Sequence, residues 1–150
     1  LCYAFRLKHQ IRAMAKIELI RIPVIGWLLS KAGIFGVDRG KSDIGAIKQA
    51  MKYLREGEKV LIFPEGTRVR SSRGDVSQPK AGAAMLAVRC GVPILPVYVP
   101  EHKRWFRRTP VVIGEAFTPT VATRKGTQEE YEAITADLMA RIRALEAQAR

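Results

Sequence analysis

A strand–helix–strand pattern in the middle of the chain limits its fold more than any other feature. Residues 34–37 and 60–63 are short apolar runs, typical of strands that are buried on both faces of a sheet. Between them, apolar residues recur at spacings of three and four from Ile44 to Leu54, which predicts an amphipathic helix. Because the connections are short, the pattern favours a right-handed crossover and parallel pairing of the two strands.

Strands and helices alternate along the rest of the chain as well. Further strands are predicted at residues 11–15, 94–99 and 111–114, and further helices at residues 23–32, 80–90 and 127–150. The last helix should begin with a capping box of Thr127 and Glu130 and should bury Tyr131, Ile134, Leu138, Ile142 and Leu145. The sequence therefore predicts one α/β domain, residues 1–150, with a mostly parallel central sheet flanked by helices.

The apolar residues after Pro23 allow two interpretations. The predicted helix after Pro23 carries Val24, Trp27 and Leu28, which suit a membrane interface as well as a protein core. A core position is favoured, because apolar helices are most often buried. Of the two cysteines, Cys90 lies in an apolar stretch and is predicted to be a small core residue.

The net charge of +12 predicts an anionic partner, which is nucleic acid, an anionic membrane surface or a phosphorylated substrate. No stretch approaches the roughly 18 apolar residues of a membrane span. His9 and His102 lie in no cluster of metal ligands, so no metal site is expected. Phosphate-binding glycine loops and a G-x-S-x-G nucleophile motif are also missing from the sequence.

Charged and polar residues follow the two central strands at the point where each strand ends. Arg39 comes after the first strand, Glu65-Gly66-Thr67-Arg68 comes after the second, and Lys80 opens the next predicted helix. The carboxyl ends of parallel strands lie at one edge of a sheet, where two guanidinium groups can converge on one dianion. Taken singly, each residue is better explained as a solvated surface charge, because exposed Arg and Lys are common. Taken together, with Glu65 and Thr67 between them, a phosphate-binding site becomes an equally good explanation.

Four motifs carry a resemblance to a known family. GVDRG at 36–40, FPEGTR at 63–68, KAGAAMLA at 80–87 and VPILPVYV at 92–99 stand in the order and spacing of the glycerolipid acyltransferase family. Within that family the chain resembles the bacterial 1-acyl-sn-glycerol-3-phosphate acyltransferases. The resemblance extends to about Gly114, and FPEGTR together with VDRG at this separation is its most specific part.

The resemblance implies a glycerol-3-phosphate acyltransferase-like fold and a reaction that converts lysophosphatidate into phosphatidic acid for phospholipid biosynthesis. The acyl chain would come from a thioester, acyl-CoA or acyl carrier protein, and no cofactor is implied. Arg39, Glu65, Gly66, Thr67 and Arg68 would bind the phosphorylated glycerol, and Lys80 would assist with the phosphate.

The resemblance also implies a catalytic histidine, with an aspartate five residues later, in an Asn-His-x-x-x-x-Asp motif. His9 is followed at that spacing by Met14 and His102 by Arg107, so neither matches. In the family this dyad precedes the segment that matches residues 11–29. We therefore expect it to lie before Leu1, and we expect the chain to lack its catalytic base.

Three functions stay open at this point. The first is an acyltransferase at the cytoplasmic face of a membrane, where the basic and aromatic residues 101–108 would contact anionic headgroups. The second is an inactive relative that only binds phospholipid. The third is a nucleic-acid-binding module, which the charge and the Trp105-Phe106 pair would suit. The acyltransferase is the preferred interpretation, with no nucleic acid among its expected partners.

Overall fold

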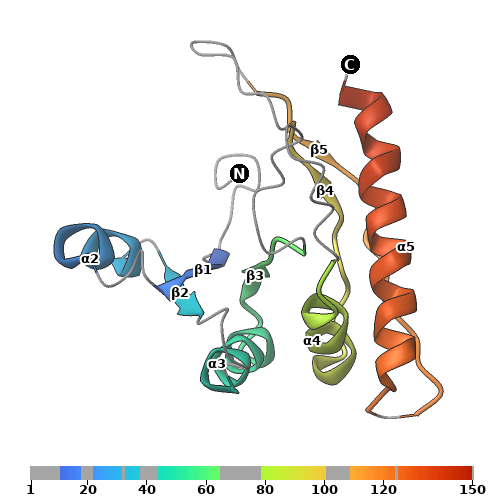
Figure 1. Ribbon diagram of the computed structural model, residues 1–150, viewed down its shortest axis with the longest axis horizontal. Coiled ribbons are helices and arrows are strands. Elements are labelled where there is room, and N and C mark those ends of the chain that lie inside the picture. Colours follow the sequence, from blue (N-terminus) through green and yellow to red (C-terminus); the bar gives the residue numbers. More distant parts are fainter. Residues whose placement is uncertain are drawn as a thin grey trace. The chain divides into compact units, whose positions relative to one another are not determined.

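The computed structural model describes residues 11–17, 22–31, 33–37, 44–64, 79–100, 109–123 and 125–149 (Figure 1). The chain divides into two compact units, Leu1–Phe63 and Pro64–Arg150. The first unit contains a parallel three-stranded sheet with helices, as an α/β fold requires.

The sheet of the first unit has the strand order β2-β1-β3, with both outer strands parallel to β1. Its strands are β1 (Ile11–Lys16), β2 (Ile34–Val37) and β3 (Lys59–Leu61). The prediction of three parallel strands here is confirmed. The predicted pairing of the second with the third is wrong, because β1 lies between them and forms hydrogen bonds with both.

Two helices belong to the same unit, α2 (Pro23–Lys31) and α3 (Ile44–Arg55), and both lie where the sequence predicts them. Helix α3 contacts β2 and β3. It buries Ala46 and Ala50, whose small side chains let the helix axis come close to its neighbours. The predicted apolar face is only partly buried, because Ile47, Met51 and Leu54 are half-buried and Ile44 is 64% exposed.

Helix α2 is not the core helix that we expected. Val24, Trp27 and Leu28 are 78%, 61% and 62% exposed, whereas Gly26 is buried. The helix contacts β2 and is apolar almost all round. A helix of nine residues cannot bury every side against one neighbouring strand, so the side opposite Gly26 is left in solvent.

Strand β3 is shorter and less buried than predicted. Its hydrogen-bonded ladder ends at Leu61, Lys59 is exposed, and Phe63 is 58% exposed. The physical reason is that β3 is an outer strand of the described sheet, with a partner strand on one side. Residues 60–63 are therefore not a strand buried on both faces.

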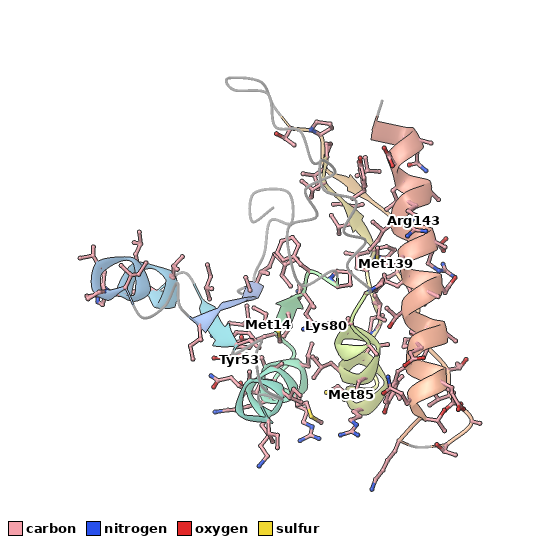
Figure 2. All side chains as sticks on the ribbon, viewed as in Figure 1. Met14, Tyr53, Lys80, Met85, Met139 and Arg143 are labelled. Atoms are coloured by element: carbon pink, nitrogen blue, oxygen red, sulfur yellow. The ribbon has the colours of Figure 1, made fainter. Side chains whose placement is uncertain are left out.

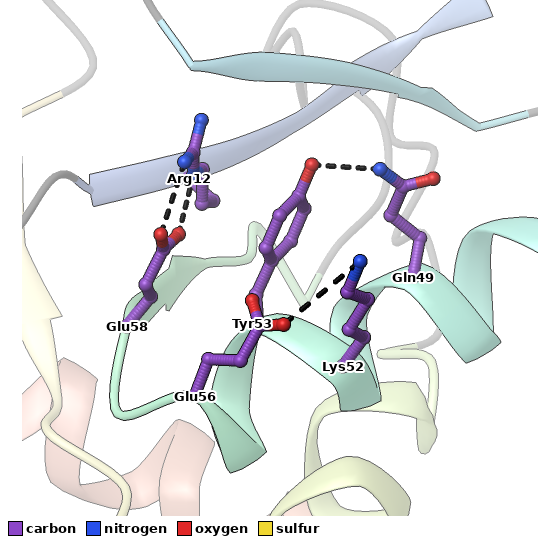
Figure 3. Close-up of polar contacts among 6 residues, drawn as sticks. All are labelled: Arg12, Gln49, Lys52, Tyr53, Glu56 and Glu58. Atoms are coloured by element: carbon purple, nitrogen blue, oxygen red, sulfur yellow. Dashed lines mark hydrogen bonds and ion pairs between the residues drawn. The ribbon is translucent and has the colours of Figure 1, made fainter.

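An arginine at the amino end of β1 forms an ion pair with a glutamate directly before β3 (Figure 3). Arg12 donates hydrogen bonds from Nε and Nη2 to the two carboxylate oxygens of Glu58, the second at 3.0 Å. Its guanidinium carbon lies 4.8 Å from the centroid of the Tyr53 ring, and the Tyr53 hydroxyl accepts a 2.7 Å hydrogen bond from Gln49. The hydrogen bond to Glu58 raises the pKa of Arg12 further above its ordinary value, so the guanidinium stays charged at any physiological pH.

The second unit contains α4 (Gly82–Cys90), β4 (Val97–Tyr98), β5 (Val112–Ile113), α5 (Gln128–Glu146) and the short helix η2 (Ala147–Ala149). Strands β4 and β5 form an antiparallel pair that is separate from the parallel sheet, and an isolated bridge joins Ile94 to Phe117. Both strands are shorter than predicted. Pro96 lacks the backbone N–H that a longer ladder along residues 94–99 would need.

Helices α4 and α5 pack side by side and form the core of the second unit (Figure 1). Helix α4 begins two residues later than predicted and buries Ala84, Leu86 and Ala87. The predicted core residues Tyr131, Leu138 and Leu145 of α5 are confirmed. Ile134 and Ile142 are only half-buried, and Thr135 and Met139 are buried in addition. Cys90 is a half-buried free thiol rather than a core residue.

The predicted capping box at the start of α5 is present. Thr127 Oγ1 accepts a hydrogen bond of 3.2 Å from the Glu130 N–H, and Glu130 Oε2 accepts one of 2.7 Å from the Thr127 N–H. Glu130 Oε1 accepts a further 2.7 Å bond from the Ala122 N–H. This last bond, followed by the one from Thr127, lowers the pKa of Glu130 below its ordinary value of 4.5. The charged form of Glu130 is therefore the one that holds the preceding loop against the helix.

Replacing Glu130 with glutamine should destabilise the protein in a pH-dependent way. The folded pKa is the lower one, so the charged carboxylate contributes stability above the unfolded value near 4.5. That contribution disappears as the pH falls through the folded pKa. Urea denaturation at a series of pH values should therefore show a gap between the wild type and Glu130→Gln at pH 7 that closes in acid. Glu129→Gln changes the same charge in the same helical turn, outside the capping box, and should give a smaller gap.

Candidate functional site

The carboxyl edge of the parallel sheet is where the sequence predicts the site. Val37, the last residue of β2, pairs with Lys16 at the end of β1, whereas Leu61 of β3 pairs with Ala13. The chain then continues through Ile62 and Phe63. Two strand spacings of about 4.8 Å separate β2 from β3, so the two strands run about 10 Å apart.

Five of the six predicted site residues lie outside the described part of the chain. They are Arg39, Glu65, Gly66, Thr67 and Arg68. The structure does describe the residues that come just before them. Arg39 comes two residues after Val37, and Glu65 comes two residues after Phe63. The prediction that both strands end at the same edge of a parallel sheet is confirmed. The convergence of the two arginines on one ligand stays a prediction.

Lys80 is the sixth predicted residue, and the structure describes it next to Pro64. Its backbone N–H donates a 2.9 Å hydrogen bond to the carbonyl of Pro64, the residue immediately before Glu65. The side chain of Lys80 is exposed at the beginning of α4 (Figure 2). The bond joins the two residues that flank 65–79, and so it brings Lys80 to the start of the Glu65–Arg68 segment.

The amino end of α4 offers backbone donors next to Lys80. Its N-cap residue is Ala81, whose methyl side chain cannot accept a hydrogen bond from the first turn. Amides at the start of a helix are donors that can help to hold a phosphate. Lys80 itself precedes the helix, which begins at Gly82, so it does not open the helix as predicted.

Phe63 is more exposed than the sequence predicted. We expected it to be buried in the sheet, but it is exposed at the end of the first unit, directly before the Pro64-Glu65 step. Its sequence signal was Pro64, because a strand that ends before a proline can leave its last side chain outside the ladder. In the sequence, Phe63 stands two positions before Glu65, the first residue of the predicted Glu65–Arg68 phosphate-binding segment.

Among the described residues there is neither a cluster of metal ligands nor a membrane-spanning helix. Within residues 11–149, apart from the gaps in the description, no group of three or more His, Cys, Asp and Glu side chains is arranged to hold a metal ion. Among the helices that the structure describes, none is long and apolar enough to cross a bilayer. His9 and His102 lie outside the described residues.

Comparison with known proteins identifies the family. The sequence model of the Acyltransferase family matches residues 1–100, which is most of the chain and includes the strand ends described above. The chain belongs to the acyltransferase family. This confirms the family that the GVDRG and FPEGTR motifs led us to expect.

The similar proteins share one name, 1-acyl-sn-glycerol-3-phosphate acyltransferase. The Bacillus subtilis protein is 35% identical over 145 residues, which are 93% of this chain and 71% of the relative. The Pseudomonas aeruginosa protein is 38% identical over 94 residues, 60% of this chain and 35% of the relative. The chloroplast protein BAT2 of Brassica napus is 36% identical over 86 residues, 56% of this chain and 24% of the relative. The aligned part therefore spans only about a quarter to a third of the latter two proteins. No solved structure matches the chain significantly.

Proposed function

We propose that the protein transfers an acyl chain from a thioester to the free hydroxyl of 1-acyl-sn-glycerol-3-phosphate and so makes phosphatidic acid. The observation that carries this proposal is the Bacillus subtilis relative of that name, which aligns with 93% of the chain. The parallel sheet supports it, because the strands that precede Arg39 and Glu65–Arg68 end at one edge.

The phosphate of the acceptor would be bound by Arg39 from the β2 side and Arg68 from the β3 side. Guanidinium groups suit this task because their paired N–H donors match two phosphate oxygens at once. Glu65 and Thr67 would bind the glycerol hydroxyl region, and Gly66 would let the backbone approach it. Lys80 supplies a further positive charge beside Pro64, where the Glu65–Arg68 segment begins.

The reaction needs a base, because a hydroxyl is a weak nucleophile until its proton is removed. The acceptor oxygen would form a bond with the thioester carbonyl carbon, the carbon–sulfur bond would break, and the base would pass the proton to the leaving thiolate. We propose that this base is the histidine of an Asn-His-x-x-x-x-Asp motif encoded before Leu1. No cofactor is required, since the thioester already carries an activated acyl group.

The two units would together form one glycerol-3-phosphate acyltransferase-like domain at the cytoplasmic face of an anionic membrane. Lysophosphatidate resides in such a membrane, and the net charge of +12 favours its surface. The donor would be acyl-CoA or acyl carrier protein, both of which are anionic. Residues 101–108 remain a second basic segment for headgroup contact.

The test is an acyl-transfer assay on the complete protein, including whatever is encoded before Leu1. Labelled acyl thioester and lysophosphatidate should give labelled phosphatidic acid, and replacing the histidine of the expected upstream motif with alanine should abolish the product while lysophosphatidate binding persists. Binding without transfer by the unmodified protein would instead identify an inactive phospholipid-binding relative. Transfer that survives the histidine variant would contradict the mechanism, and tight, salt-sensitive DNA binding would favour the nucleic-acid alternative.

A further inference from the structure

Helix α2 presents a row of apolar side chains to solvent. Val24, Trp27 and Leu28 stand at positions i, i+3 and i+4, so they share one face of the helix, and all three are more than half exposed. The buried residue Gly26 marks the opposite side, where the helix contacts β2. An apolar face of this kind, on a helix that the sheet already holds in place, indicates an interaction surface.

The charge on α2 is that of a helix at an anionic surface. Lys31 is the single ionisable residue of the helix and follows Leu28 by three residues, on the same face. Its Nζ lies 4.4 Å from the centroid of the Trp27 ring, a cation–π arrangement that keeps the charge at the edge of the apolar row. Tryptophan and lysine placed together in this way suit the boundary between acyl chains and headgroups.

We propose that α2 lies flat in the surface of an anionic lipid bilayer, with Val24, Trp27 and Leu28 below the headgroups and Lys31 among the lipid phosphates. This deepens the proposed function and rests on it, since it names the surface through which the enzyme would meet its lipid substrate. A bilayer fits better than a protein partner. Three side chains on a nine-residue helix offer far less area than the about 800 Å² per partner of a stable protein interface.

The connection from α2 to the site explains what such docking would achieve. Helix α2 contacts β2, and β2 runs to Val37, two residues before Arg39. A helix held in the headgroup layer would therefore hold the parallel sheet at the membrane surface. Lysophosphatidate could then reach the carboxyl edge of the sheet by diffusing within the bilayer.

The first experiment measures binding of the complete protein to vesicles by co-sedimentation. Vesicles of phosphatidylcholine with a quarter of phosphatidylglycerol should bind the protein, and pure phosphatidylcholine should bind it more weakly. Leu28→Asp should lower the partition coefficient about tenfold, because a leucine leaves the apolar layer and a negative charge enters it. The matched control is Ile44→Asp on α3, an equally exposed apolar residue of the same unit at 64%, which should change binding less than twofold. Equal losses in the two variants would overturn the proposal.

A second experiment follows Trp27 directly. Trp27 and Trp105 are the two tryptophans of the chain, so Trp105→Phe leaves Trp27 as the reporter in the described region. Anionic vesicles should shift its emission to shorter wavelength. Lipids brominated near the headgroup should quench it more than lipids brominated at the chain end. Vesicle binding with unchanged Trp27 emission would overturn the proposal, because the protein would then dock through another surface.

The same protein can test the role of the Lys31 charge and whether a second copy of the chain covers the apolar face instead of a bilayer. Lys31→Glu should weaken binding to anionic vesicles several-fold, whereas Lys48→Glu, the same change on exposed α3, should have little effect. A dimer that Leu28→Asp converts to a monomer would show that a second copy covers the face, and would contradict the proposal. The vesicle assays need no turnover, so a failure of acyl transfer would be recognised separately from a failure of docking.

Discussion

Replacing Arg68 with lysine in the complete protein is expected to lower kcat/KM for lysophosphatidate about a hundredfold. Arginine offers two parallel N–H donors to a phosphate, and lysine offers a single point charge. A hydrogen bond to a charged group contributes about 1.5–3 kcal/mol, and a hundredfold loss corresponds to about 2.7 kcal/mol. The positive charge is retained, so the loss would report the geometry of recognition rather than the net charge of the site.

A second acceptor substrate distinguishes a loss of phosphate recognition from a general loss of activity. A monoacylglycerol has the same acyl chain and hydroxyl but no phosphate, so its slow transfer should be nearly the same in the wild type and in Arg68→Lys. The matched control is Arg55→Lys at the end of α3, an exposed arginine that should leave both substrates unaffected. Equal losses on both acceptors would show that Arg68 supports the fold or the donor site instead of the phosphate.

The local parts of the fold could be predicted because their signals lie within a few residues. The repeat of apolar residues from Ile44 to Leu54 gave α3, and the Thr127–Glu130 spacing gave the start of α5 with its capping box. The parallel direction of the strands also followed from their short helical connections. These features depend on backbone geometry close to the residues concerned.

The order of the strands could not be predicted in the same way. β1 lies between β2 and β3, although neither its length nor its composition distinguishes a central strand from an outer one. The pairing of Arg12 with Glu58 is the contact that joins β1 to the turn before β3, and these residues are far apart in the sequence. Pairing over such a separation depends on the whole set of packing choices and leaves no local pattern.

The exposure of apolar residues could not be predicted from the sequence either. The residues of α2 are apolar whether the helix is buried or faces a membrane, so composition alone favoured the commoner outcome, which is wrong here. The same limit applies at Phe63. For the candidate site, the motifs named residues and the strands supplied a common edge. Whether Arg39 and Arg68 meet one ligand depends on the segments that follow the strands, where periodicity gives no information.

The loop before α5 should be the part of the second unit that tolerates substitution least. Gly126 has a φ of +68°, a conformation that costs a residue with a side chain roughly 1–2 kcal/mol. A Cβ added there would lie 2.8 Å from Cε1 and 3.2 Å from Cζ of Tyr131. That ring is only 5% exposed, and its hydroxyl donates a hydrogen bond to the carbonyl of Lys125. The ring cannot move aside without losing burial and this bond.

Gly126→Ala is therefore expected to cost about 2–5 kcal/mol of unfolding free energy, the sum of the backbone term and an overpacking term. Gly91→Ala is the matched control. Gly91 has a similar φ of +64° at the end of α4, but a Cβ there would meet no atom within 4 Å, so it should cost only the backbone term. Urea denaturation gives both values, and near-ultraviolet circular dichroism reports the tyrosine packing. Equal costs for the two variants would mean that the Tyr131 ring yields freely, and that the capping box alone holds this loop to α5.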